Sequence, residues 1–456
     1  MYNLLIQPYA FVKNYLNSGH ARSIRAKKNI IASFLLKGLS IPISLIVVPL
    51  TINYINPTRY GIWLTMTSIV GWFSFFDIGF GNGLRNKFAE SLAKDKHEEA
   101  RIYVSTTYAI LSIIISIALI LFICINPFLN WSKILNTPPG MAGELSLLAF
   151  IVFSFFCLQF VLRLISTIIT ANQQPAKASV FNFFGNLFSL AVIFILTKTT
   201  SGNLINLAIA TNVIPVLVLI ALSFWYYTHE YRQYTPSIKY VNFKFARNLM
   251  TLGLKFFIIQ IAFMVLYQTD NIIIAQLFGP SQVTPYNIAY KFFGIIPMVF
   301  GIIMVPFWSA FTESWSKRDI EWIKATMKKL QILWALLSVV TLIMLFSAEF
   351  IYKLWVGKRI IIPFSISLSI AMYVVINAWN GIYSVFLNGV GKIKIQLYAS
   401  VIGMILNIPL AIFLGKAMGV GGVILSSVVF GGINMIWSII QYNKIINNKA
   451  FGIWDE

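Results

Sequence analysis

Long apolar segments alternate with short polar and basic segments along almost the whole chain. About 20 apolar residues cross the hydrocarbon layer of a bilayer as a helix, and the pattern predicts twelve such spans. They lie near residues 30–54, 60–82, 102–127, 144–171, 178–198, 204–228, 250–278, 286–311, 329–352, 363–388, 395–416 and 420–443. We therefore expect an all-α, polytopic membrane protein.

The twelve expected spans divide into two similar halves. In each half a basic stretch leads to a lysine inside the first span, Lys37 or Lys255. That span then closes at Asn56-Pro57 or at Gly279-Pro280. Such a parallel repeat is typical of transporters, with two six-helix bundles around a central cavity. The expected parts are a cytoplasmic tail (1–29), an N-terminal bundle (30–228), a cytoplasmic linker (229–249), a C-terminal bundle (250–443) and a cytoplasmic tail (444–456).

The charge of the chain is strongly positive, with 35 lysines and arginines against 14 acidic residues. In a soluble protein this balance would suggest nucleic acid, but 58% of the residues are hydrophobic and only 11% are charged. With the N-terminus in the cytoplasm, 24 of the 35 cations fall in cytoplasmic segments and seven in outer segments. The positive-inside rule thus predicts that both termini are cytoplasmic. We expect no nucleic-acid partner, and residues 1–29 lack the pattern of a cleavable signal peptide.

Four cations remain inside expected spans, namely Lys37, Arg163, Lys255 and Lys291. An ionised side chain at the bilayer centre costs roughly 2.5–3.5 kcal/mol on insertion scales. Lys37 and Lys255 lie about 10 Å, and Arg163 about 12 Å, from the cytoplasmic ends of their spans. These three could form a ring open to the cytoplasm, or their long side chains could extend to the headgroups. The first alternative predicts a cationic, substrate-binding cavity, and Lys291 is a further candidate for a substrate-binding cation there.

Asp270 and Lys291 lie at roughly matching depths on the seventh and eighth expected spans. One interpretation is a structural ion pair between consecutive helices. The other is that Asp270 couples transport to an ion, because an intramembrane carboxylate commonly marks an ion or proton path. The sequence leaves both interpretations open.

A glycine-rich turn follows the second expected span, with Asp77, Gly79, Gly81, Gly83 and Arg85 in the stretch DIGFGNGLRNK. The glycines permit close helix approach or a left-handed backbone, so we expect a structural or conformational role. A short amphipathic surface helix is predicted after the turn. A phosphate loop is excluded, since no strand precedes the glycines and no Lys-Ser/Thr follows them.

No metal site or cofactor is expected. The cysteines, Cys124 and Cys157, fall in apolar spans and are interpreted as small core residues. His20, His97 and His229 fall far apart in polar segments and lack the spacing of a zinc site.

Several motifs resemble bacterial polysaccharide flippases of the O-antigen translocase type, within the multidrug/oligosaccharidyl-lipid/polysaccharide exporter superfamily. They are DIGFGNGLRNK (77–87), GLKFFIIQ (253–260), TDNIIIAQ (269–276) and TPYNIAYKFF (284–293). The resemblance implies a V-shaped pair of six-helix bundles in the bacterial inner membrane. It implies flipping of an undecaprenyl-diphosphate-linked oligosaccharide to the periplasmic leaflet, with a proton or sodium ion as the coupling ion. Membrane lipid and other glycan-assembly membrane proteins are the implied neighbours.

Two other functions deserve comparison with the flippase hypothesis. A multidrug exporter of the same superfamily, working as an antiporter, is the main alternative, although a cationic cavity would repel cationic drugs. An integral membrane glycan polymerase or ligase would need acid–base groups on a sizeable outer loop. The expected outer loops are short and nearly free of carboxylates, so we expect no enzymatic activity.

Overall fold

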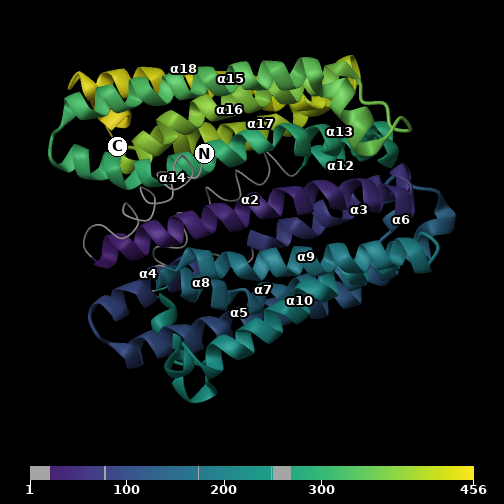
Figure 1. Ribbon diagram of the computed structural model, residues 1–456, viewed down its shortest axis with the longest axis horizontal. Coiled ribbons are helices and arrows are strands. Elements are labelled where there is room, and N and C mark those ends of the chain that lie inside the picture. The colour runs from purple at the N-terminus through teal and green to yellow at the C-terminus, as the bar shows by residue number, and fades with distance from the viewer. Residues whose placement is uncertain (1–20, 76–78, 173, 248, 250–268, 456) are drawn as a thin grey trace, which may run out of the picture.

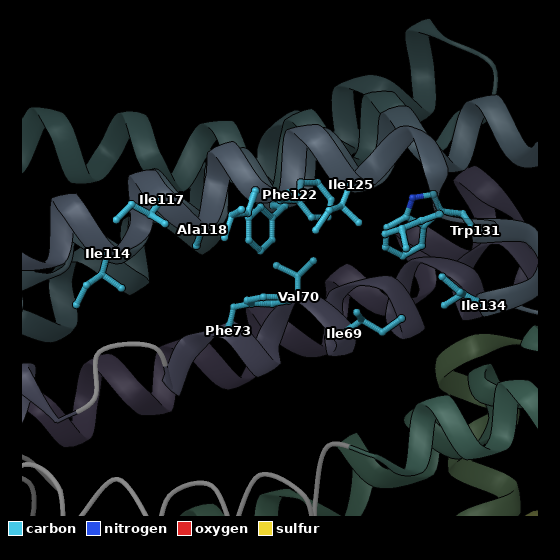
Figure 2. Close-up of a pocket in the computed structure, with 13 residues that line it drawn as sticks. Ile69, Val70, Phe73, Ile114, Ile117, Ala118, Phe122, Ile125, Trp131 and Ile134 are labelled. Carbon is cyan, nitrogen blue, oxygen red and sulfur yellow. The ribbon is translucent and has the colours of Figure 1, made fainter.

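The computed structural model describes residues 21–75, 79–172, 174–247, 249 and 269–455. Regular structure in these residues is entirely helical (Figure 1). Ten helical segments among them are long and apolar enough to cross a membrane, which confirms a polytopic all-α protein. Two of the twelve expected spans are not among the ten. The span at 60–82 breaks after Gly71, and most of the span at 250–278 lies outside the described residues.

The N-terminal half forms one bundle, coloured purple to teal in Figure 1. Helix α2 packs against α9, and α10 packs against both α7 and α9. The helices are α2 (Ala21–Ile55), α3 (Pro57–Gly71), α4 (Phe80–Ala93), α5 (His97–Ile125), α6 (Trp131–Ile134), α7 (Ala142–Leu162), α8 (Leu164–Ala171), α9 (Pro175–Thr199) and α10 (Leu204–Thr228).

The C-terminal half forms the second bundle, coloured green to yellow in Figure 1. Helix α16 packs against α14, α15 and α18, and α18 packs against α17. The helices are α12 (Asp270–Phe278), α13 (Pro280–Phe293), α14 (Ile295–Ser316), α15 (Ile320–Val356), α16 (Phe364–Val390), α17 (Lys394–Met418) and α18 (Val420–Ile446).

Equivalent turns begin α3 and α13, and local sequence explains both. The Asn56 side chain accepts a hydrogen bond from the Arg59 amide at 3.0 Å, and Pro57 occupies the first position of α3, where no amide hydrogen is needed. In the second half Gly279 adopts a φ of 88°, which ends α12, and Pro280 begins α13. The expected closures at Asn56-Pro57 and Gly279-Pro280 therefore both occur.

The apolar core shows how the two bundles meet. One cluster of buried residues includes both halves around α3 and α13, with Ile62 and Met66 on one side and Val283 and Ile288 on the other. At the other end of the helices each half has its own cluster, one around Phe88 and one around Phe311. The described bundles are therefore joined at one end and separate in their packing at the other, as a V-shaped arrangement requires.

The linker after α10 is attached to the N-terminal bundle. His97 Nδ1 and the Tyr234 hydroxyl lie 2.7 Å apart, and Arg101 donates to the Thr235 carbonyl at 3.1 Å. The Arg101 guanidinium also lies 4.2 Å from the centre of the Tyr240 ring. These contacts hold the linker against α5, at the end of the molecule where the two cores are separate.

Candidate functional site

Arg163 lines a pocket of about 190 Å³ in the N-terminal bundle. It is the single residue between α7 and α8, where the α-helical structure is interrupted. Its side chain is exposed, and no salt bridge to it is found in the described part of the chain. The pocket is lined by Ser74, Gly81, Leu111, Phe156, Gln159, Phe160, Arg163, Leu164 and Thr167. One cation beside neutral hydroxyl and amide groups is a suitable environment for an anion.

The glycine-rich turn forms part of this pocket. Gly79 has a φ of 81° and precedes the first residue of α4, and Gly81 lines the pocket with Arg163. A Cβ on Gly83 would lie 2.3 Å from the Leu249 carbonyl oxygen, so the glycine permits contact between α4 and the linker. Arg85 is exposed on α4, and Asp77 lies outside the described residues.

Helix α4 is amphipathic, as expected for a surface helix. Its buried residues include Leu84 and Phe88, whereas Glu90 on the exposed side binds Lys87 at 2.8 Å and Lys94 at 2.7 Å. These two ammonium groups lower the pKa of the Glu90 carboxylate to about 2.

Of the four candidate cations, the structure describes the side chains of Arg163, in the N-terminal half, and Lys291, in the C-terminal half. Lys291 lies in the last turn of α13, is half-buried, and has no salt bridge to any described residue. The side chain of Lys37, on α2, and the whole of Lys255 lie outside the description. The expected cationic ring therefore stays a prediction, with Arg163 placed at a pocket.

Asp270 is buried at the start of α12, with 5% of its surface exposed. Oδ2 accepts a hydrogen bond from the Tyr286 hydroxyl at 3.2 Å, and Oδ1 has no hydrogen-bond partner among the described residues. No ion pair joins Asp270 to Lys291 in the described structure. The ion-pair interpretation is thus not supported, because the acid is paired with a neutral tyrosine instead.

The two equivalent turns contact each other across the halves. The Thr284 hydroxyl on α13 donates to the Pro57 carbonyl at 2.6 Å. At the matching position on α3, a Cβ on Gly61 would lie 1.8 Å from the Pro280 carbonyl oxygen. Gly61, the fourth residue after Pro57, therefore faces the Pro280 carbonyl. Thr284, the fourth residue after Pro280, faces the Pro57 carbonyl. Only a glycine permits this approach at position 61.

Polar side chains add further contacts at the joined end. Asn271 on α12 donates to the Ser68 hydroxyl on α3 at 2.7 Å, and Asn287 on α13 donates to the Asn271 side chain at 2.6 Å. Asn136, after α6, donates to the Ala275 carbonyl at 3.0 Å. These bonds connect the end of the N-terminal bundle to α12.

Several of these residues have no role in the sequence-based prediction. Asn271, Tyr286 and Asn287 lie in the motifs TDNIIIAQ and TPYNIAYKFF, so the motifs indicated their region but not their contacts. Gln159 and Thr167 lie four residues before and after Arg163, which is the spacing of one helix face. That spacing could have identified them as neighbours of Arg163.

The profile of the polysaccharide biosynthesis protein family matches residues 26–311, and that of the MatE family matches residues 256–413. The chain belongs to the polysaccharide biosynthesis protein family. This confirms the resemblance that the motifs indicated. The first match covers well over half of the chain and includes Arg163, the glycine-rich turn, Asp270 and Lys291.

Similar members of this family are known from enteric bacteria. A Salmonella typhi protein named as an O-antigen transporter is 24% identical over 281 residues, which are 60% of this chain and 63% of that protein. A Yersinia pseudotuberculosis protein named as an O-antigen export protein is 24% identical, over 78% of this chain and 81% of that one. A Salmonella typhimurium protein named as an O-antigen transporter is 23% identical, over 92% and 96% respectively.

Solved structures of multidrug resistance MATE transporters share the fold of this family member. An inward-facing structure matches with a TM-score of 0.67 at 14% identity, over 88% of this chain and 96% of that one. An outward-facing structure matches with a TM-score of 0.66 at 14% identity, over 93% of this chain and 96% of that one. The chain is therefore a multi-pass membrane protein with a transporter fold.

Proposed function

We propose that this protein flips an undecaprenyl-diphosphate-linked oligosaccharide from the cytoplasmic to the periplasmic leaflet of the bacterial inner membrane. The observation that carries the proposal is Arg163, which lines a pocket of the N-terminal bundle and has no carboxylate partner among the described residues. A guanidinium forms strong, bidentate hydrogen bonds with phosphate oxygens. The family and its relatives, which are named for O-antigen transport, support the choice of substrate.

Alternating access would follow from the two bundles. The basic segments orient the separate end toward the cytoplasm, so the substrate would enter there. The joined end, at Gly61 and Thr284, would then face the periplasm. Release on that side requires these contacts to break while the bundles rotate about one another.

Asp270 would couple this change to a proton or sodium gradient. Its buried Oδ1 has no partner in the described part of the chain and lies on the helix that makes polar contacts with α3, which supports that role. Asp270→Asn should fold but lose the dependence of transport on the ion gradient, measured in proteoliposomes with imposed gradients. Retention of that dependence would remove Asp270 from the coupling mechanism.

The experiment that tests the function uses cells that lack this gene and depend on a plasmid copy for surface glycan. Arg163→Ala should abolish most surface glycan while the protein level stays normal, because the diphosphate loses its guanidinium. Arg163→Lys should be intermediate, since a lysine keeps the charge but not the bidentate geometry.

The matched control is Arg359→Ala, on an exposed arginine between α15 and α16. It should transport normally. Surface glycan at the wild-type level in Arg163→Ala, at an equal protein level, would overturn the proposed role of the pocket.

A multidrug exporter is the second candidate, because the MatE profile matches residues 256–413. The phenotype of cells that lack this gene distinguishes the exporter from the flippase. Loss of drug tolerance with unchanged surface glycan would favour the exporter. Accumulation of complete lipid-linked repeat units on the cytoplasmic side would favour the flippase.

A further inference from the structure

A second polar pocket lies in the C-terminal bundle, away from Arg163. It has a volume of about 300 Å³ and is enclosed by α16, α17 and α18. Among the residues that the structure describes, its lining has no charged side chain and consists largely of amides, hydroxyls and aromatic rings. The lining residues are Tyr373, Ile376, Asn377, Asn380, Gly381, Ser384, Gln396, Ser400, Ser427, Phe430, Gly431, Asn434, Trp437 and Ser438.

Four amide side chains in one pocket are unusual inside membrane-spanning helices. Burial of an amide away from water costs free energy unless its hydrogen bonds are made. Asn380 donates to the Gly431 carbonyl at 2.9 Å, but its Oδ1 is buried and has no partner in the described structure. Gln396 Oε1 is likewise buried without a partner there. The pocket thus holds hydrogen-bonding capacity that the described protein atoms do not use.

The shape of the pocket depends on glycine and on a fixed aromatic ring. A Cβ on Gly431 would lie 2.7 Å from Ile376 Cγ2, so the glycine allows α18 to approach α16. The Trp437 indole donates to Asn434 Oδ1 at 2.8 Å, which fixes the orientation of the ring. The pocket therefore presents rigid polar and aromatic groups together.

The pocket lies toward the ends of the helices that carry the basic segments. Asn380 is about 15 Å from the end of α16 at Val390, and Ser400 is about 9 Å from the start of α17 at Lys394. In the proposed orientation this is the cytoplasmic half of the membrane, where the substrate enters.

The chemistry of the lining selects a class of ligand. The described lining residues include no cation that would favour a phosphate and no carboxylate that would favour a cationic drug. Neutral hydroxyl groups match it well, because each can donate to an amide oxygen and accept from an amide nitrogen. Sugar rings also stack on indole and phenol faces, and the volume is near the lower limit of small-molecule sites, about 300–1,000 Å³.

We propose that this pocket binds a neutral sugar residue of the glycan while Arg163 binds the diphosphate. The inference rests on the proposed flippase function and assigns a separate part of the substrate to each bundle. A substrate that contacts both bundles binds with an affinity that depends on how the bundles are placed relative to each other. Its binding would therefore favour one arrangement of the two bundles.

Binding measurements on the full-length protein in lipid nanodiscs test this assignment. The probes are undecaprenyl diphosphate and the lipid-linked oligosaccharide extracted from cells that lack this gene. The double variant Asn380→Leu/Gln396→Met keeps side-chain volume but removes both amides. It should weaken oligosaccharide binding about tenfold or more, since each lost bond to a neutral partner costs about a threefold to tenfold change in affinity. Its affinity for undecaprenyl diphosphate should stay unchanged.

Two further variants separate the explanations. Arg163→Ala should weaken the binding of both probes, and Asn443→Leu, an exposed amide of α18 outside the pocket, should change neither. If the double variant does not fold, Ser384→Ala/Ser400→Ala gives the same comparison with smaller changes.

The outcomes distinguish this inference from the proposed function. Wild-type protein that binds neither probe would overturn both. Wild-type protein that binds the two probes equally, or a double variant that binds the oligosaccharide as the wild type does, would overturn the sugar pocket alone. A double variant whose affinity for both probes falls by the same factor would also overturn the sugar pocket. An altered sodium dependence with unchanged oligosaccharide affinity would instead make the pocket an ion site.

Discussion

At the residue scale, Gly61 and Asp270 show what sequence patterns can and cannot predict. The buried acid on the seventh span could be predicted from its charge in an apolar run. Its partner could not, because matched depth suggested Lys291, whereas the Tyr286 hydroxyl reaches the carboxylate. Depth along a helix does not give the direction of a side chain around it. The same limit concealed the contact of Gly61 with Pro280.

Substitution of Gly61 should destabilise the joined end of the bundles. In Gly61→Ala the new Cβ would lie 1.8 Å from the Pro280 carbonyl oxygen, so α3 or α13 must move. Overpacking of this kind costs about 1–3 kcal/mol. Thermal unfolding of the purified protein should show a lower midpoint, and surface glycan should fall.

The control for this prediction is Gly143→Ala on α7. Apart from its chain neighbours and the backbone of its own helix, no described atom lies within 4 Å of a Cβ built there, so stability and transport should stay near the wild type. An unfolding midpoint for Gly61→Ala equal to that of the wild type would contradict the tight contact.

At the element scale, local signals predicted helix ends better than helix continuity. Asn56-Pro57 and Gly279-Pro280 mark the ends of α2 and α12 because caps and glycine act within a few residues. Hydropathy alone does not show that the second span stops being α-helical after Gly71, or that α7 ends at Leu162. Such interruptions leave the apolar pattern intact, so the pattern could not reveal the one at Arg163.

Helices α3 and α12 should move apart if access alternates between the two sides of the membrane. In a variant with Cys124 and Cys157 replaced by alanine, Ser68→Cys/Asn271→Cys spans the halves at a contact of 2.7 Å. A short, reducible bis-methanethiosulfonate cross-linker should block transport, and a reductant should restore it.

The matched pair for this cross-link is Asn271→Cys/Asn287→Cys, whose side chains also touch but belong to one half. Its cross-link should leave transport intact. Transport that continues through the Ser68–Asn271 cross-link would show that this end does not open.

At the scale of the whole molecule, the distribution of basic residues predicted which side of the membrane each end of the protein faces. The packing of the bundles differs between the same two ends. The joined end carries few cations, whereas the separate end carries the linker and α4. The two-bundle plan was predictable because a repeated pattern of turns and spans is visible in the sequence. The pocket between α16, α17 and α18 could not be predicted from the sequence, since its amides come from three different helices.

Cysteine labelling in intact cells tests this orientation. In the background without native cysteines, Lys239→Cys on the linker should react with a membrane-impermeant maleimide only after the inner membrane is permeabilised. Lys358→Cys, between α15 and α16, should react from the periplasm, and both lysines are exposed. The reverse pattern would invert the proposed direction of transport.

The approach of the Pro280 carbonyl to Gly61 has a consequence for the cell that makes this protein. Two backbones in direct contact leave no space between them for water, so we expect this contact at the joined end to help exclude ions. A transporter of the proposed kind that failed to close there would discharge the membrane potential each time its other side opened. Toxicity on overexpression, rather than loss of glycan alone, is therefore the expected mark of a damaged contact.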